Sequence, residues 1–213
     1  MKILERALAS ARNYEAARRV IGAESEMRNL MLRVVEPSAD LRILDFGCGN
    51  GRLVPFVGQA QYVGIDNNPS YIRSAKDRNR QNNATFLCAD LRDLASMDIA
   101  PCDVIVSIGV LHHLDDEAAA TALEACAGLL KTSGRLVTMD PCFDPDQHPV
   151  ARVLMALDRG KYVRHPTNYE SLIGTHFVTD LAENWTDIYR FPYTHFVTQS
   201  RLRSLADLGC GDK

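Results

Sequence analysis

A glycine-rich stretch and an aspartate give this sequence its clearest chemical signal. Residues 43–51 read ILDFGCGNG, an apolar run that leads into closely spaced glycines and then into a helical pattern. Glycines at such a turn let the backbone approach a ligand closely at the carboxyl ends of parallel strands. Asp66 ends the next apolar run, where a carboxylate can accept hydrogen bonds from both hydroxyls of a ribose. A glycine turn alone is also typical of a tight connection that binds nothing.

A further aspartate follows the third apolar run. Asp90 stands in the segment LCADL at 87–91, where a carboxylate can accept a hydrogen bond from the exocyclic amino group of adenine. Taken singly, each aspartate is more often a helix cap or a solvated loop residue. Acids at the ends of successive strands together favour a nucleoside-binding site.

Two nucleoside cofactors compete for this site, NAD and S-adenosylmethionine. A dinucleotide fingerprint would place its third glycine at position 52, which is Arg52. Asp45, directly before the glycines, would repel a pyrophosphate, whereas S-adenosylmethionine has no phosphate and carries a cationic amino-acid portion. The residues therefore favour S-adenosylmethionine.

These residues resemble the class I S-adenosylmethionine-dependent methyltransferase superfamily over roughly residues 40–142. The matching motifs are the glycine stretch, the acidic strand end VGID, the segment CADL, the signature LHHL at 111–114 and the turn LKTSGRL. The LHHL signature is common in small-molecule methyltransferases related to the quinone-biosynthesis group. The resemblance implies an α/β fold, a doubly wound Rossmann-like sheet of seven strands in the order 3-2-1-4-5-7-6 with the last strand antiparallel. A helical N-terminal cap would cover it.

The resemblance places the cofactor at the ends of the first four strands. The residues expected to bind it are Asp45, Gly47, Cys48, Gly49, Asp66, Asn67, Asp90, Leu91, Ser107 and Ile108. An acid-Pro-Pro-aromatic motif, found in many methyltransferases that act on DNA bases or glutamine, is missing at 107–110. A small molecule is therefore the expected acceptor.

In this fold, a small acceptor binds under the N-terminal helices and the segment after strand five. The residues expected to contact it are Tyr14, Asp140, Arg159, Tyr162 and Arg164. The basic run at 158–165 is most often a solvated loop in proteins. If it lines the pocket, its guanidinium groups suit a carboxylate or phosphate on the acceptor.

Methyl transfer is an in-line displacement, so positioning supplies most of the rate. Transfer to a hydroxyl additionally needs a base with a pKa near neutral, and histidine is the natural candidate. His113, just past strand four, and His195, at the start of the last strand, are the candidates, although packing against the cofactor explains the LHHL histidines equally well. The expected function is methyl transfer to a small molecule at oxygen. The alternatives are an NAD-dependent oxidoreductase and a non-catalytic protein that binds S-adenosylmethionine.

The periodicity of apolar residues predicts the elements that position these groups. Residues 2–35 have helical spacing, and Asn68 and Asp115 or Asp116 begin two later helices. A helix is also expected at 151–157, and a capping box formed by Thr167 and Glu170 predicts another. The expected strands are Arg42–Asp45, Tyr62–Asp66, Thr85–Cys88, Val104–Ile108 and Arg135–Asp140, with a late antiparallel pair at 184–190 and 194–200.

The composition indicates one domain over 1–200, since 213 residues are too few for two ordinary cores. We expect a helical cap at 1–38, a cofactor-binding half at 39–142, a substrate-side half at 143–200 and a tail without clear structure at 201–213.

The net charge of −3 argues against a nucleic-acid partner. No apolar run approaches the ~20 residues of a membrane span, and charges interrupt any signal peptide, so a cytoplasmic protein is expected. The six cysteines form no C-x-x-C pair, so neither a disulfide framework nor a metal site is predicted. The sequence leaves the oligomeric state open.

Overall fold

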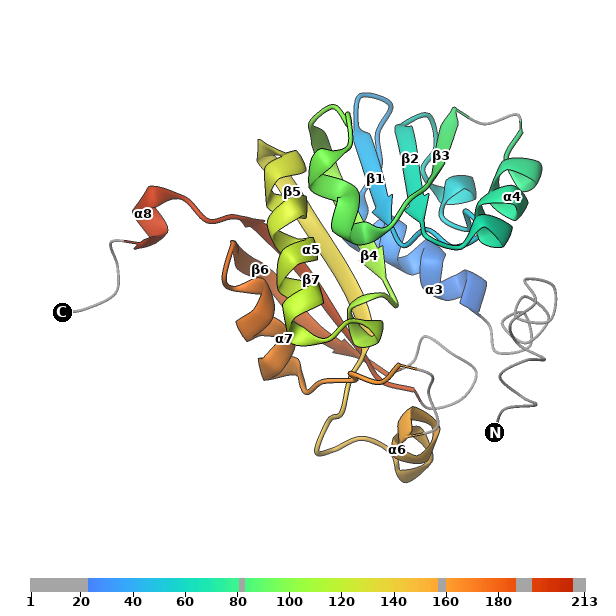
Figure 1. Cartoon of the computed structure of the whole chain (residues 1–213). Helices are drawn as coiled ribbons and strands as arrows, with labels where there is room; N and C mark the ends of the chain where they lie inside the picture. Colours follow the sequence, from blue (N-terminus) through green and yellow to red (C-terminus); the bar gives the residue numbers. More distant parts are fainter. Residues whose placement is uncertain (1–22, 81–82, 157–159, 187–192, 209–213) are drawn as a thin grey trace.

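The computed structural model describes residues 23–80, 83–156, 160–186 and 193–208. Their strands form one seven-stranded sheet in the order β3-β2-β1-β4-β5-β7-β6 (Figure 1). The strands are β1 Arg42–Phe46, β2 Gln61–Asp66, β3 Ala84–Cys88, β4 Cys102–Ile108, β5 Leu130–Pro141, β6 Phe177–Trp185 and β7 His195–Leu202. β1 to β5 pair in parallel, whereas β7 runs antiparallel to both β5 and β6. The predicted fold class and strand order are confirmed.

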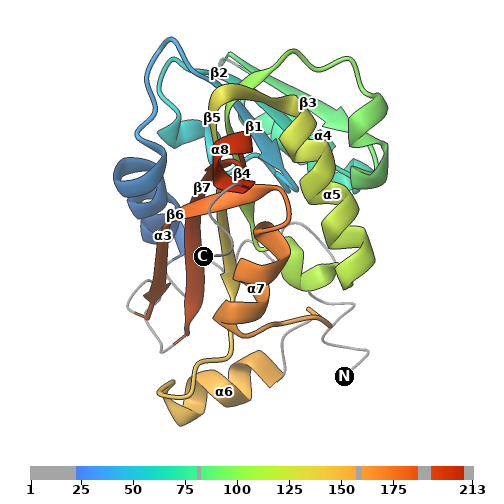
Figure 2. The same ribbon diagram turned by 90° about the vertical axis from the view of Figure 1, so that its left-hand side faces the viewer.

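Both faces of the sheet are buried. Neighbouring residues of a strand point to opposite faces, so Ile43 packs into one apolar core and Leu44 into the other. The first core contains residues of α3 (Ala23–Leu30), the π-helical turn η1 (Met31–Val35) and α4 (Pro69–Arg78). The second contains residues of α5 (Asp116–Leu129) and α7 (Pro166–Ile173). Figure 2 shows α3 and α5 on opposite sides of the sheet.

Short helical elements connect the strands near their carboxyl ends. Three 3-10 turns follow β1, β3 and β4, and they are η2 Val54–Phe56, η3 Leu91–Ser96 and η4 Leu111–His113. A further helix, α6 (Pro149–Ala156), lies beyond the carboxyl end of β5 (Figure 1). None of the described helices is long and apolar enough to cross a bilayer.

Two predicted helix caps are confirmed. The Asn68 side chain accepts hydrogen bonds from the backbone N–H groups of Ser70 and Tyr71 at the start of α4. The Asp115 carboxylate accepts one from the N–H of Ala118 at the start of α5. Each cap satisfies backbone donors that have no partner within the helix.

The predicted capping box of Thr167 and Glu170 is wrong. α7 begins at Pro166 with His165 as its N-cap, and no side chain caps it. A proline suits the first helical position because its φ is fixed near the helical value and its missing N–H would have no partner there. The proline therefore sets the start of this helix.

The expected late strand pair is placed differently at its first member. β6 covers 177–185, and its pairing runs from Phe177 opposite Leu202 to Trp185 opposite His195, while 187–190 of the expected strand lie outside the described residues. β6 is an edge strand that carries Asp180 and Glu183, and such charges obscure the apolar signal of a strand.

The expectation of no clear element at 201–213 is also wrong in part. β7 continues to Leu202, and α8 covers Leu205–Leu208. Of the helices expected at 2–35, the structure describes the part from residue 23 onward. Two residues expected to contact the acceptor, Tyr14 and Arg159, lie outside the described residues.

Candidate functional site

The glycine turn after β1 has a backbone that only glycine adopts without strain. Gly47 has a φ of 77°, and Val110 of the β4–η4 connection occupies the space that a Cβ at this position would need, with Cγ2 2.4 Å away. Gly49 has a φ of 54°, and a Cβ there would meet nothing within 4 Å. The first glycine therefore serves close packing, and the second leaves open space beside the backbone.

Asp66 connects the glycine turn to the start of α4. One carboxylate oxygen accepts a hydrogen bond from the N–H of Gly49 at 2.9 Å, and the other accepts one from the N–H of Asn68 at 2.8 Å. Burial raises the pKa of this carboxyl, while the two N–H groups oppose that shift. The carboxylate is thereby fixed on a pocket wall at the end of β2, as the sequence predicted.

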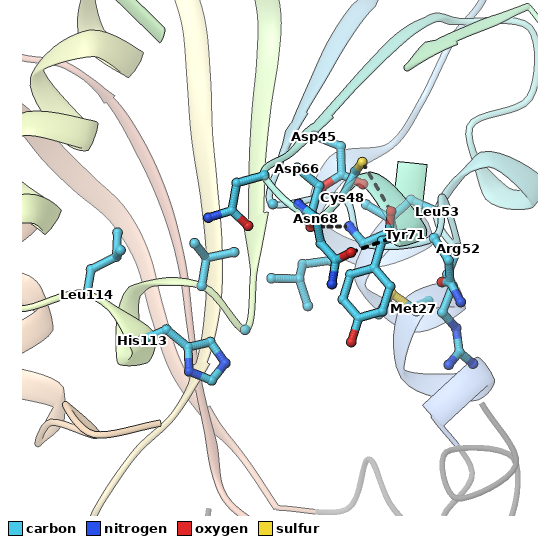
Figure 3. Close-up of a pocket in the computed structure, with 17 residues that line it drawn as sticks. Met27, Asp45, Cys48, Arg52, Leu53, Asp66, Asn68, Tyr71, His113 and Leu114 are labelled. Carbon is cyan, nitrogen blue, oxygen red and sulfur yellow. Dashed lines mark hydrogen bonds between the residues drawn. The ribbon is translucent and has the colours of Figure 1, made fainter. Parts of the chain in front are cut away.

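A pocket of about 450 Å³ opens at this edge of the sheet (Figure 3). Seven of the ten residues predicted to bind a cofactor line it, and these are Asp45, Gly47, Cys48, Gly49, Asp66, Asn67 and Ile108. The motifs did not indicate these further lining residues: Met27, Asn50, Arg52, Leu53, Asn68, Tyr71, Val110 and Leu114. Most of these directly adjoin the recognised motifs, which is a usable signal. Met27 belongs to α3, and no motif indicates it.

Asp45 is the most deeply placed charged group of this pocket. Its side chain is 3% exposed, and it accepts a hydrogen bond from the hydroxyl of Tyr62 on β2. Burial raises the pKa of Asp45 to about 7, the Tyr62 hydrogen bond opposes this shift, and the nearby Asp66 charge adds to it. The carboxyl therefore changes its charge near neutral pH.

The described lining of the pocket does not include the other three predicted cofactor residues, Ser107, Asp90 and Leu91. Ser107 is buried within β4. Asp90 caps η3, which begins at Leu91, and its two oxygens also accept hydrogen bonds from the Arg92 guanidinium at 2.9 and 2.8 Å. The Arg92 hydrogen bonds lower the pKa of Asp90. Adenine recognition by Asp90 stays a prediction.

The two adjacent histidines of η4 have different surroundings. His113 lines the pocket and lies across it from Tyr71 in Figure 3. His112 is buried, and its Nδ1 lies 2.7 Å from a carboxylate oxygen of Asp140, which also accepts a hydrogen bond from the His112 backbone N–H. Asp140, predicted to contact the acceptor, therefore holds η4 against the end of β5.

The described part of the basic run also holds η4. Arg164 is 8% exposed, and its guanidinium donates to the carbonyls of Leu111, Leu114 and Tyr162 and to the carboxylate of Asp116. These five hydrogen bonds use all five guanidinium N–H groups. The geometry therefore does not support Arg164 as a ligand for an anionic acceptor.

The backbone around Arg164 makes further contacts with η4. The N–H of Tyr162 donates to the carbonyl of His112 at 3.0 Å, while the Tyr162 side chain is 40% exposed. Gly160 lies so close to the His112 ring that a Cβ would meet its Cδ2 at 2.0 Å. The expectation of a solvated loop is thus wrong for Arg164, whereas Lys161, Tyr162 and His165 are exposed as that expectation has it.

The second predicted base, His195, begins β7. It is buried, pairs with Pro141 in the sheet and lies with its ring 5.0 Å from that of Tyr193. The described lining of the pocket does not include it. In the described part of the chain, no group of three or more His, Cys, Asp or Glu side chains could hold a metal ion.

Comparison with known proteins agrees with this geometry. Residues 43–134 match a family described as "Methyltransferase domain". Over 104 residues the chain is 34% identical to a ubiquinone biosynthesis O-methyltransferase from Xylella fastidiosa, covering 47% of this chain and 42% of that protein. A protein of the same name from Neisseria meningitidis is 31% identical over 118 residues, which cover 51% of this chain and 49% of the relative. The chain thus spans less than half the length of these relatives.

Solved structures extend the similarity over nearly the whole chain. The magnesium protoporphyrin IX methyltransferase of Synechocystis PCC 6803, solved with bound SAH, gives a TM-score of 0.69 at 19% identity and covers 96% of this chain and 100% of its own. The pyocyanin biosynthetic protein PhzM gives a TM-score of 0.76 at 14% identity, covering 95% and 61%. At such low identity these matches establish the fold alone.

Proposed function

Because residues 43–134 match the methyltransferase domain family, we propose that this chain transfers a methyl group from S-adenosylmethionine to an oxygen of a small-molecule acceptor. The observation that carries the proposal is the pair of carboxylates on one pocket, Asp45 and Asp66, with the open backbone of Gly49 between them. This donor and acceptor set suits a nucleoside that carries an amino-acid group.

The residues present fit the two ends of this cofactor. Asp66 is placed to accept hydrogen bonds from ribose hydroxyls, since its oxygens already face the glycine turn and the start of α4. Asp45 and Arg52 line the same pocket, and a carboxylate and a guanidinium together suit a zwitterionic amino-acid group. When bound, S-adenosylmethionine supplies a methyl group on a positively charged sulfur, which is a good leaving group.

Two observations oppose the oxidoreductase alternative. Arg52 stands where the dinucleotide fingerprint has its third glycine, and the buried Asp45 carboxylate would face a pyrophosphate across the glycine turn. The matched family is one of methyltransferases. Measured turnover distinguishes the proposed enzyme from the second alternative, a non-catalytic protein that binds S-adenosylmethionine.

The choice of oxygen as the accepting atom rests on the names of the relatives and on His113. Both relatives are named O-methyltransferases, and His113 lines the pocket where it could accept a proton from an acceptor hydroxyl. His195 is the second candidate base. An anionic group on the acceptor is no part of the proposal, because Arg164 is engaged in hydrogen bonds and Arg159 lies outside the described residues.

Binding and turnover test the proposal in two steps. Calorimetry should show binding of S-adenosylhomocysteine and none of NAD. Incubation with S-adenosylmethionine and a panel of phenols, aliphatic alcohols, carboxylic acids and amines should then give products that have gained one methyl group on oxygen. Binding of NAD alone contradicts the proposal, as does methylation of amines only.

His113→Gln should reduce kcat at least about a hundred-fold, because general-base catalysis contributes roughly that much or more. The matched control is His176→Gln, since His176 lies between α7 and β6, outside the described pocket lining. An unchanged kcat in His113→Gln would rule out His113 as the base, and His195→Gln would then test the second candidate.

A further inference from the structure

A buried tyrosine supports the carboxylate of the cofactor pocket from behind. The Tyr62 hydroxyl donates a hydrogen bond to Oδ2 of Asp45, and the two residues are 2% and 3% exposed. Asp45 lines the pocket, whereas the described lining does not include Tyr62. The tyrosine can therefore act on a bound ligand only through the aspartate.

The register of the sheet fixes this contact. Asp45 on β1 lies opposite Gly64 on β2, and Tyr62 lies two residues earlier on the same face of β2. Cys48 and Phe86 fill the space that a side chain at Gly64 would need, with atoms 2.8 and 3.0 Å from its Cβ position. The Tyr62 ring packs edge-on against Phe86 at 5.8 Å between centroids. The phenol is thus held in place, with its hydroxyl directed at Asp45.

A hydroxyl at this place is chemically informative. A buried hydroxyl is costly without a hydrogen bond, and phenylalanine would fill the same apolar space without that cost. The hydroxyl that donates to Asp45 favours the charged form of this carboxyl and restricts its orientation. Burial and the Asp45 charge raise the pKa of Tyr62 well above its usual value, so it remains a donor at every physiological pH.

We infer that Tyr62 is a positioning residue, which favours the charged form of the Asp45 carboxylate and orients it to receive the ammonium group of the amino-acid portion of the cofactor. This inference rests on the proposed function, and it adds a pH dependence to cofactor binding. The amine-bearing ligand should bind more tightly as pH rises through about 7, where Asp45 loses its proton.

The other ionisable groups near Asp45 act in known directions. Asp66 raises the pKa of Asp45 by charge repulsion, and the Cys48 thiol lies beside both carboxylates. Arg52 and His113 line the same pocket. All of these groups remain in place when the Tyr62 hydroxyl is removed, so a Tyr62→Phe variant isolates the contribution of the hydrogen bond.

The test compares two ligands that differ by the amino-acid portion. S-Adenosylhomocysteine carries the ammonium group, and 5′-methylthioadenosine is a similar nucleoside thioether without it. In Tyr62→Phe, the affinity for S-adenosylhomocysteine at about pH 7 should fall on the order of ten-fold, the effect expected for a lost hydrogen bond to a charged group. The deficit should shrink toward about pH 9, where Asp45 is charged without help. The affinity for 5′-methylthioadenosine should be unchanged.

Tyr169→Phe is the matched control. Tyr169 is also a buried tyrosine whose hydroxyl donates a hydrogen bond, at 3.0 Å to the carbonyl of Pro141, and it packs in a different apolar cluster. It should bind both ligands as the unmodified chain does. Because the ammonium of the ligand titrates identically with every variant, the ratio of affinities between variant and parent reports on Asp45.

Each result decides a separate question. An equal loss for both ligands, no loss, or a loss for S-adenosylhomocysteine that does not depend on pH overturns the inference and leaves the proposed function standing. If Tyr62→Phe does not fold, the pH profile of the unmodified chain decides, and a flat profile of S-adenosylhomocysteine affinity between about pH 6 and pH 8 overturns the inference. Failure of the unmodified chain to bind S-adenosylhomocysteine at any pH rejects the proposed function itself.

Discussion

The two sides of the sheet's carboxyl edge use the same residue types for different purposes. On the β1–β2 side, Asp45 and Asp66 line the pocket, and Asp66 is fixed by N–H groups at most 17 residues away. On the β5 side, Asp140 and Arg164 bind the η4 turn across sequence separations of 28 to 53 residues. Charged groups on the first side line the pocket, and those on the second hold the chain together.

The largest expected effect tests the structural role of Arg164. Arg164→Met should lower the free energy of unfolding by roughly 3–5 kcal/mol, because it leaves the carbonyls of Leu111, Leu114 and Tyr162 without their charged donor. Affinity for S-adenosylhomocysteine, measured where the variant is folded, should be unchanged. Chemical denaturation and calorimetry give the two values. Arg152→Met, an exposed position on α6, is the control and should cost under about 1 kcal/mol. A ligand-binding defect without a stability loss would remove the distinction between the two sides.

The next effect has the opposite sign, because Asp45→Asn is expected to raise the free energy of unfolding. The charged Asp45 side chain destabilises the ligand-free fold. The pKa of Asp45 is about 7 in the fold against 3.8 when unperturbed, so the folded state holds this proton more tightly. The free energy of unfolding contributed by this group is fully present below about pH 4 and is lost as pH rises through about 7. Asp45→Asn should remove this dependence and stabilise the ligand-free protein by about 2–4 kcal/mol at pH 8, with weaker binding of S-adenosylhomocysteine. Denaturation curves at several pH values measure it, and an identical pH slope in parent and variant would contradict it.

A smaller effect, on ligand affinity, is expected for the Asp66 carboxylate that is proposed to bind the ribose. Asp66→Ala should weaken S-adenosylhomocysteine binding at least ten-fold, since charge-assisted hydrogen bonds are worth roughly 1.5–3 kcal/mol. Asp77→Ala, on the exposed face of α4, serves as the control. If Asp66→Ala binds as tightly as the parent, the cofactor does not occupy this pocket in the proposed orientation.

The smallest effect is expected at Asp90. Asp90→Ala should cost about 1 kcal/mol of stability through the lost cap of η3. If Asp90 reads adenine, the parent should bind S-inosylhomocysteine more weakly than S-adenosylhomocysteine, and the variant should lose that preference. Equal binding of the two ligands by the parent would limit Asp90 to its structural contacts with Arg92.

The comparison also explains what the sequence could predict. The positive φ angles of the glycine turn and the cap at Asn68 are local features of a few residues, so spacing reveals them. The Tyr62 hydrogen bond to Asp45 depends on the pairing register of two strands, which no single segment encodes. Met27 enters the pocket from α3 for a reason of tertiary packing.

The basic run at 158–165 was misleading because its contacts also depend on residues that are distant in the sequence. Arg164 stands in a basic run that is typical of a solvated loop or an anion site, yet it is buried against η4. Burial of a guanidinium depends on acceptors brought to it by the fold, here the carbonyls of Leu111 and Leu114. The sequence shows that an arginine is present at such a position but does not show which acceptors it will bind.

The position of β7 between β5 and β6 has a consequence for synthesis on the ribosome. β1 to β4 pair with each other and can assemble while later residues are still being added, since a chain is made from its N-terminus. β5 pairs with β4 along one edge, but its other edge stays unpaired until residues 195–202 are made. β6 pairs with that same late segment. During this interval two strands expose unpaired backbone groups, which are the groups through which nascent chains associate with one another. We therefore expect the β5 and β6 strands to be the part of the sheet that associates most readily with other chains before β7 is made.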